Sequence, residues 1–316
     1  MGRVVEESLN CSGSVLIVGT GALALSFAAR LGVNGLPVGI LGTWKDGLTA
    51  IQRDGARFVC QDGRELSAPV QASADPSMFR GAPLALVLVK AWQTPRAAAQ
   101  LNECLAPGGL AVSLQNGLGN REALVAALGP ARVGLGVTAA GATLLGPGLA
   151  RSGGDGTITL ESSPHAGMGL LAGLLAAAGF DVQYAANVDS LVWGKLVANS
   201  AINPLTALLR VPNGALLERP DARALMAELA RETAAVAQAL GVDLPYPDPL
   251  AFVEQLAQQT AANRSSMLQD VEHGRPTEID AICGAVARLG EIARVPTPAN
   301  RLVAQLVGAL DPTATR

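Results

Sequence analysis

A lysine and two asparagines stand at four-residue intervals in the strongly apolar segment LVWGKLVANSAINPLTALL. They are Lys195, Asn199 and Asn203. At about 3.6 residues per turn, a helix places these side chains in one slowly drifting stripe. Burying such groups without partners costs roughly 2 kcal/mol or more for each. A ligand with a carboxylate and a hydroxyl would supply the partners, and the alternative is an ordinary, partly exposed polar face. Pro204 lacks an N–H, so it is expected to free a carbonyl in this helix.

A glycine-rich turn follows the apolar run VLIV and precedes a run of strong helix formers. It has the form G-x-G-x-x-A and consists of Gly19, Thr20, Gly21, Ala22, Leu23 and Ala24. In such a turn the first glycine permits the tight bend and the second lets a pyrophosphate approach the backbone. The small third residue lets helix and strand pack closely, and the helix N-terminus binds the phosphates. The strand–turn–helix context favours a dinucleotide site over a merely structural turn.

The end of the second strand distinguishes NAD from NADP. An NAD site normally has Asp or Glu about 20 residues after the fingerprint, where it binds the ribose hydroxyls. The segment GILGTWKD has no carboxylate before Asp46, which comes too late in the chain. Thr43 and Lys45 are suited to a 2′-phosphate, which predicts NADP. For Lys45 the alternative is a solvated residue at a helix start.

Polar residues also end two further apolar strands. Lys90 finishes LALVLVK, and Asn116 ends LAVSLQN before a tight glycine loop. Because ligands of open α/β sheets bind outside the carboxyl ends of the strands, both residues together are expected at the binding crevice, and the alternative for each alone is a polar residue that merely ends a strand. Further on, Ser266 and Glu278 lie twelve positions apart in NRSSMLQDVEHGRPTEIDAICG. Thr277 is expected to cap a following helix, whose first turn would then favour Glu278 for structural reasons alone.

The elements that position these residues change in kind along the chain. Apolar strands are expected at 15–19, 37–41, 84–90 and 110–117, and helices at 22–31, 45–54, 94–105 and 120–128. Strands that are apolar at every position and alternate with helices indicate a parallel sheet covered on both faces. Extra strands or a hairpin are expected at 55–70. Strands within 132–160, a helix at 168–179 and a short strand in FDVQYA are expected to extend the sheet.

Helical periodicity dominates from about residue 187 onward. Helices are expected at 188–209, 221–240, 249–259, 277–293 and 299–310. The predicted fold is therefore an α/β Rossmann-type doubly wound parallel sheet domain over residues 1–186, followed by an all-α helical domain over residues 187–316. Residues 1–14 are expected to form a loose N-terminal extension of the first domain.

The composition excludes several classes of protein. The 316 residues are 49% hydrophobic, with 23 Lys and Arg against 26 Asp and Glu, so the net charge of −3 gives no electrostatic footprint for nucleic acid. No apolar run reaches the roughly 20 residues of a membrane span, and the N-terminus lacks the features of a signal peptide. We therefore expect no nucleic-acid or membrane partner and a cytoplasmic location. Four scattered cysteines and two histidines predict no metal site.

Several segments together resemble the ketopantoate reductase (2-dehydropantoate 2-reductase) family, within the wider 6-phosphogluconate dehydrogenase-like group. The matching segments are VGTGALA, LVKAWQT, LQNGLGN, the WGKLVANSAINPLTALL helix with its PNG sequel, and NRSSMLQDVEHGRPTEIDAICG. The resemblance implies a Rossmann domain, a helical domain and an active site in the cleft between them. It also implies NADPH-dependent reduction of 2-dehydropantoate to (R)-pantoate, on the route to pantothenate and coenzyme A.

The resemblance assigns roles to residues one by one. Lys195 would be the general acid and would also bind the substrate. The other substrate-binding residues would be Asn199, Asn203, Asn213 and Ser266, and the cofactor would contact the glycine turn, Lys90, Asn116, Ala140 and Glu278. Thr43 replaces the family's usual basic residue after the second strand, so Lys45 is expected to take its place. Since the family includes monomers and dimers, a homodimer is one expected state. The alternatives are a reductase of another branched 2-oxo acid and a non-catalytic NADP-binding regulator.

Overall fold

The computed structural model describes residues 14–311, which form two compact units. The first unit comprises residues up to 89, 93–115 and 120–188. The second comprises residues 90–92, 116–119 and the chain from 189 onward. Two short loops from the first half of the sequence therefore belong to the second unit. All but the last residue of the expected N-terminal extension lies outside the described residues.

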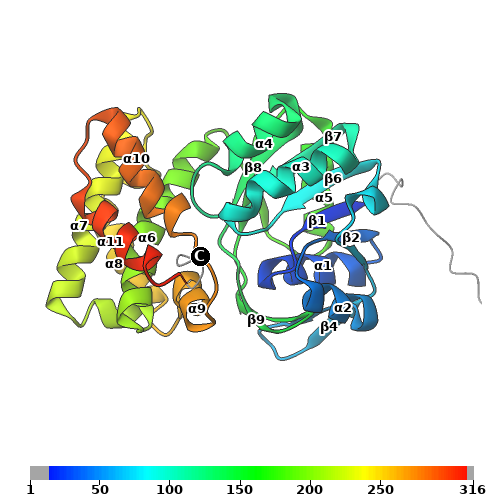
Figure 1. The fold of residues 1–316 in the computed structure, drawn as a ribbon, viewed down its shortest axis with the longest axis horizontal. Coiled ribbons are helices and arrows are strands. Elements are labelled where there is room, and N and C mark those ends of the chain that lie inside the picture. Colours follow the sequence, from blue (N-terminus) through cyan, green and yellow to red (C-terminus); the bar gives the residue numbers. More distant parts are fainter. Residues whose placement is uncertain (1–13, 312–316) are drawn as a thin grey trace, which may run out of the picture. The chain divides into compact units, whose positions relative to one another are not determined.

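The first unit contains an eight-stranded sheet within the described residues (Figure 1). Its order is β12 (Val182–Ala185), β11 (Ile158–Glu161), β8 (Val133–Thr138), β7 (Leu105–Ser113), β6 (Ala82–Val87), β1 (Val15–Val18), β2 (Val38–Leu41) and β5 (Gln71–Ser73). Every neighbouring pair is parallel except the antiparallel pair β8 and β11. The predicted doubly wound parallel sheet is confirmed.

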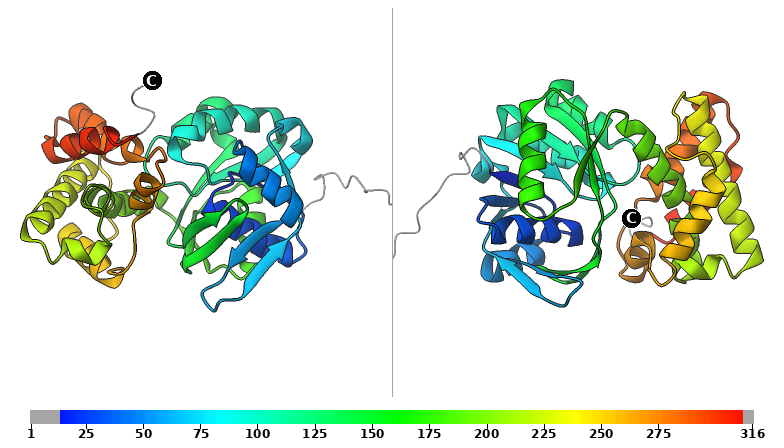
Figure 2. Two further views of the ribbon diagram at one scale, coloured as in Figure 1. Left: turned by 60° about the horizontal axis from the view of Figure 1, so that its bottom comes forward. Right: turned by 180° about the vertical axis from the view of Figure 1, so that it is seen from behind.

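Alternate side chains of each central strand enter different cores. In β1, Val15 and Ile17 pack with residues of α1 (Ala22–Val33) and α5 (Ala166–Ala177). Leu16 and Val18 pack with α3 (Thr94–Cys104) and α4 (Asn120–Leu128) on the opposite face. Figure 2 shows α5 on the far side of the sheet from α3 and α4. Because both faces are covered, the central strands need to be apolar at every position, which is the pattern the sequence shows.

The expectation that the strands within 132–160 extend the large sheet is wrong in part. β8 and β11 join that sheet, but β9 (Gly141–Gly146) and β10 (Leu149–Gly154) do not. They form a second sheet with β3 (Ala56–Val59) and β4 (Glu65–Ala68), and α1 packs against this sheet as well. Gly148, with φ of +71°, folds β9 back onto β10, so these two strands pair with each other and the other edge of β10 pairs with β3. The helix α2 (Lys45–Asp54) completes this part of the unit.

The second unit is helical around one apolar core. Its helices are α6 (Val188–Leu209), α7 (Pro220–Ala239), α8 (Pro249–Gln259), α9 (Ser266–Glu272), α10 (Cys283–Ala293) and α11 (Pro298–Gly308). The chain enters a 3₁₀ turn at Asn213–Leu216 and another at Ile279–Ala281. α6 has the bounds expected from the sequence and runs through Pro204 without interruption. The carbonyl that Pro204 leaves without its usual donor is that of Ser200, and it accepts the thiol of Cys283 at 3.6 Å.

Two expectations for the helical part are wrong. The sequence predicted one helix over 277–293, but the chain makes a 3₁₀ turn first and α10 begins only at Cys283. The interruption is at Ile282, whose φ of −103° and ψ of −94° lie outside the helical region. The short helix α9 was also missed. Thr277 accepts the N–H of Ile279 at 3.3 Å just before the 3₁₀ turn, so it does not cap α10, whose N-cap is Ile282.

Candidate active site

The glycine turn has the geometry of a phosphate-binding loop. Gly19 has a φ of +135°, and a Cβ at this position would lie 3.1 Å from the carbonyl of Leu88, which follows β6. β1 and β6 are the neighbours between which the strand order reverses, and this point is where α/β sheets bind ligands. Gly21, the N-cap of α1, has open space within 4 Å of its Cβ position and no side-chain cap. An open, uncapped helix N-terminus fits a pyrophosphate.

The end of β2 packs directly on this turn. A Cβ on Gly42 would lie 2.4 Å from the side-chain methyl group of Thr20, so only glycine allows this approach. The next residues, Thr43 and Lys45, have exposed side chains, and Lys45 opens α2. The structure therefore brings Thr43 and Lys45 beside the glycine turn, where the ribose end of a dinucleotide would lie.

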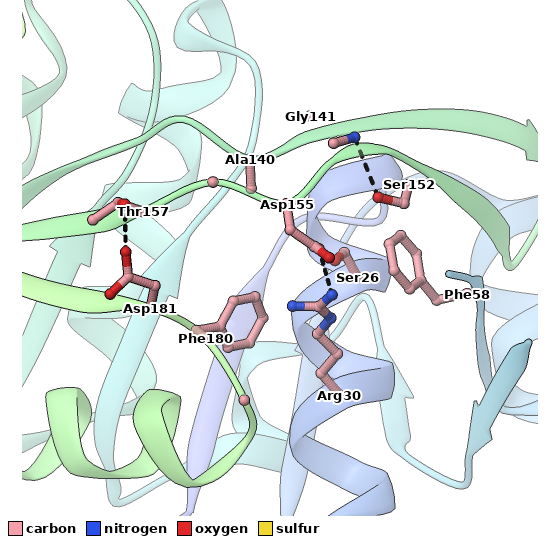
Figure 3. Close-up of a pocket in the computed structure, with 13 residues that line it drawn as sticks. Ser26, Arg30, Phe58, Ala140, Gly141, Ser152, Asp155, Thr157, Phe180 and Asp181 are labelled. Carbon is pink, nitrogen blue, oxygen red and sulfur yellow. Dashed lines mark hydrogen bonds and ion pairs between the residues drawn. The ribbon is translucent and has the colours of Figure 1, made fainter. Parts of the chain in front are cut away.

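Ala140 lies elsewhere in the first unit. It follows β8, and its N–H donates to the hydroxyl of Thr138 at 3.1 Å. Together with Ser26 and Arg30 of α1 it lines a pocket that contains none of the residues of the glycine turn (Figure 3). The expected contact of Ala140 with the cofactor thus stays a prediction.

The polar stripe of α6 is largely buried. Asn203 is 8% exposed, while Lys195 and Asn199 are half-buried. The Nδ2 atom of Asn199 is buried and has no hydrogen-bond partner among the described residues. A buried amide without an acceptor is unfavourable by roughly 1–3 kcal/mol, so this donor is suited to a bound ligand. The geometry argues against an ordinary solvated helix face.

Burial changes the acidity of the lysine in this stripe. Desolvation lowers the pKa of Lys195 to about 8, and the negative charge of Glu278 partly opposes this shift. An amine that titrates near neutral pH can both carry a proton and release it. Lys195 therefore has the acidity that a general acid requires.

Lys90 lies between two buried carboxylates of the second unit. Its Nζ is 2.5 Å from Oδ2 of Asp270 and 3.7 Å from Oε2 of Glu278. The other oxygen of Glu278 accepts the N–H of Ala91 at 3.0 Å. Burial lowers the pKa of Lys90, but the charges of Glu278 and Asp270 outweigh this effect and raise it above the ordinary value. The loop at 90–92 is thus fastened to the segment that carries Glu278.

The loop at 116–119 is fastened to the same segment. The N–H of Leu118 donates to the carbonyl of Ala281 at 2.8 Å. Gly117 has a φ of +77°, and a Cβ there would lie 2.5 Å from that carbonyl oxygen. Asn116, next in the chain, is half-buried. Lys90, Asn116, Lys195 and Glu278 therefore all belong to one compact unit.

Asn213 and Ser266 complete the set predicted to bind substrate. Asn213 is 8% exposed, and its Nδ2 donates to the hydroxyl of Thr260 at 2.9 Å while its buried Oδ1 has no partner within residues 14–311. Ser266 is exposed at the start of α9. The adjacent Ser265 caps that helix and exchanges a 2.7 Å hydrogen bond with Thr206 of α6. This bond ties α9 to the helix of the polar stripe.

Sequence reasoning missed Asp270 and Ser265. Asp270 is 6% exposed and pairs with Lys90, 180 positions away in the sequence. The residues next to Asp270 therefore give no indication of this contact. Ser265 could have been found, because a serine three positions before an apolar helical residue is a common N-cap. The first unit holds the glycine turn, Thr43, Lys45 and Ala140, and the second unit holds the other predicted residues.

Family models match both halves of the chain. Residues 15–165 match the family "Ketopantoate reductase PanE/ApbA", and residues 187–311 match "Ketopantoate reductase PanE/ApbA C terminal". The fold and these matches define an oxidoreductase with a Rossmann-like domain and a helical C-terminal domain. The chain belongs to the ketopantoate reductase family. Between residues 14 and 311, the helices lack the combination of length and hydropathy that a membrane span needs.

Individual relatives agree with the family. A 2-dehydropantoate 2-reductase of Halobacterium salinarum is 32% identical over 93% of this chain and 97% of its own, and one of Archaeoglobus fulgidus is 33% identical over 94% and 97%. A crystal structure of a PanE/ApbA family ketopantoate reductase from Ralstonia eutropha is 33% identical, with a TM-score of 0.88 over 96% of this chain and 100% of its own. A D-mandelate dehydrogenase with NADH and anilino(oxo)acetate shares the fold at 24% identity, 96% and 100% coverage, and a TM-score of 0.89.

Proposed function

We propose that this protein reduces 2-dehydropantoate to (R)-pantoate with NADPH. The observation that carries the proposal is the buried polar stripe of α6, in which Asn199 has an unpartnered amide one turn from Lys195. The relatives of Halobacterium salinarum and Archaeoglobus fulgidus, which match over 93% and 94% of this chain, are named 2-dehydropantoate 2-reductase, which supports the same substrate. A branched 2-oxo acid has the carboxylate, carbonyl and hydroxyl oxygens that the stripe's donors can bind.

The cofactor assignment is supported by the first unit. The uncapped N-terminus of α1 fits the pyrophosphate, and the Thr43–Lys45 segment at the end of β2 has a hydroxyl and an ammonium for the 2′-phosphate. No carboxylate stands there to favour an unphosphorylated ribose. When bound, NADPH supplies the hydride that reduces the carbonyl carbon.

The side chains of the second unit perform the remaining steps. Asn199, Asn203, Asn213 and Ser266 bind and orient the oxo acid, and their donors stabilise the charge that develops on its carbonyl oxygen. Lys195 Nζ donates its proton to that oxygen while the new C–H bond forms at the carbon, so a hydroxy acid leaves with no net charge added. Lys90 and Asn116 contact the cofactor and the reacting centre, and Glu278 contacts the nicotinamide ribose side of the site.

A direct assay tests this function. Purified protein is mixed with 2-dehydropantoate and NADPH, and the loss of nicotinamide absorbance is followed against a panel of other branched 2-oxo acids. We expect the highest kcat/KM with 2-dehydropantoate and a preference for NADPH over NADH. A higher kcat/KM for another oxo acid would assign that substrate instead. NADPH binding without turnover on any acid of the panel would indicate a regulator. Light scattering on the same sample tests the expected homodimer.

A further inference from the structure

The first unit contains a pocket whose lining includes no residue of the glycine turn. It has a volume of about 240 Å³ and lies beside the C-terminal half of α1, between β3, the β8–β9 and β10–β11 connections and the turn before β12 (Figure 3). This volume is below the roughly 300–1,000 Å³ of pockets for drug-sized ligands, so an occupant would be small. None of the residues assigned above to substrate lines this pocket, and Ala140 alone is shared with the cofactor set.

Arg30 is the main charged group in the wall. Its side chain is 15% exposed, and its only hydrogen bond within the described residues joins Nη2 to Oδ1 of Asp155 at 2.5 Å. A guanidinium is a planar fork of several N–H donors, so most of the fork is left open for an acceptor. Carboxylates fit such a fork with two parallel hydrogen bonds.

Aromatic rings fix the orientation of this guanidinium. The central carbon of the Arg30 guanidinium lies 4.9 Å from the ring centre of Phe180 and 5.8 Å from that of Phe58. Phe180 in turn stacks on Phe27 at 4.6 Å between ring centres. Figure 3 shows the rings of Phe58 and Phe180 on either side of the arginine. The fork is therefore preorganised between two rings that are themselves buried.

The acidic groups of the pocket exclude a simple anion. Asp155 is 58% exposed on its side chain, so its second carboxylate oxygen faces space that a ligand can reach. Asp181 also lines the wall and accepts the hydroxyl of Thr157 at 2.5 Å. One guanidinium against two carboxylates gives the pocket a net negative charge. A matching ligand needs a cationic group as well as a carboxylate.

We propose that this pocket binds a small zwitterion, namely an α-amino acid. Its carboxylate lies on the open fork of Arg30, and its ammonium lies on the open oxygen of Asp155. The ion pair between Arg30 and Asp155 stays intact in the complex. Each charged group of the protein then lies beside a ligand group of the opposite charge.

Calorimetric titration of the full chain without cofactor tests this proposal. The probe is L-leucine, compared with isocaproate, which lacks the ammonium, and isoamylamine, which lacks the carboxylate. We expect saturable leucine binding, and binding at least about tenfold weaker for each one-charge analogue, since each loses charge-assisted hydrogen bonds. Isocaproate binding as tightly as leucine, or no heat with leucine at millimolar concentration, overturns the proposal.

Single-residue variants test whether leucine binds in this pocket. Arg30→Gln and Asp155→Asn should each weaken leucine binding at least about tenfold. Arg53→Gln should not, since Arg53 forms an exposed ion pair with Asp54 on α2 and lines no part of the pocket. If thermal melting shows that Arg30→Gln is unfolded, the result with Asp155→Asn determines whether the site is correct, because Asp155 is exposed. Asn199→Ala should bind leucine normally. Loss of leucine binding in that variant would place the ligand on α6 and refute this site, whatever the outcome of the reductase assay.

Discussion

Lys90 and Asp270 form an ion pair of 2.5 Å between Nζ and Oδ2, although 180 positions separate them in the chain. The pair fixes the loop after β6 to helix α9, and Glu278 lies on the other side of the same ammonium. Under the proposed function, Asp270 is a positioning residue, because it would act on the reaction through Lys90.

Replacement of that carboxylate should disturb cofactor binding first. In Asp270→Asn, Lys90 loses its nearest partner, and we expect the KM for NADPH to rise about tenfold or more while kcat falls less. Asp270→Glu should recover part of this loss. The control is Glu254→Gln on α8, which breaks a partly exposed ion pair with Arg223 of α7. Steady-state kinetics with varied NADPH measures KM and kcat for each variant. If kcat fell equally in Asp270→Asn and in its control, the positioning role would be contradicted.

Removal of the proposed proton donor should abolish most turnover. Lys195→Met keeps the length of the side chain but has no proton, so kcat should fall about 10²–10⁴-fold. Leu209→Ala, at the exposed end of the same helix, serves as control and should retain normal kcat. Near-normal turnover in Lys195→Met would remove Lys195 from the mechanism.

The acidity of the same lysine predicts a pH profile. A general acid must be protonated to act, and burial lowers the pKa of Lys195 to about 8. The kcat/KM for reduction should therefore be level below this pH and fall about tenfold per pH unit above it. The reverse reaction, oxidation of the hydroxy acid, should rise over the same range, since it needs the neutral amine. A reduction rate that stays constant to pH 10 would be inconsistent with the assignment.

Lys45 should determine the choice between the two nicotinamide cofactors. Lys45→Ala removes the cation expected at the 2′-phosphate, so the KM for NADPH should rise about tenfold while the KM for NADH changes little. Arg53→Gln, at the other end of α2, should leave both values unchanged. Parallel rises for both cofactors would show that Lys45 does not contact the 2′-phosphate.

A stability prediction concerns the helical unit alone. The carboxylate of Glu232 on α7 accepts the N–H groups of Ala299 and Asn300 at 2.8 Å each, and it thereby caps α11. Glu232→Gln should lower the free energy of unfolding by about 1–3 kcal/mol, because one buried N–H is left without its acceptor. Glu228→Gln, on the exposed side of α7, should change it by less than about 0.5 kcal/mol. Urea denaturation followed by circular dichroism compares the two.

Local patterns were sufficient to predict most of the elements, while the roles of the site residues stay predictions. The glycine turn, the apolar strands and the α6 stripe each lie within one short segment of the sequence. The structure forms the glycine turn, the strands and α6 where expected. What could not be predicted depends on pairing between distant segments. The second sheet requires β10 to meet β3, and the break at Ile282 has no proline or glycine to mark it. The partner of Lys90 likewise lies on a helix that the sequence did not reveal.

The assignment of residues 90–92 and 116–119 to the helical unit limits how this protein can be divided. A fragment that starts near residue 187 would lack Lys90, and the buried carboxylates of Asp270 and Glu278 would then have lost their counter-charge. A chimera that joins this helical half to the Rossmann half of a relative would also import foreign loops against those carboxylates. A graft of the helical unit should therefore succeed only when the loops 90–92 and 116–119 are transferred together with the helices.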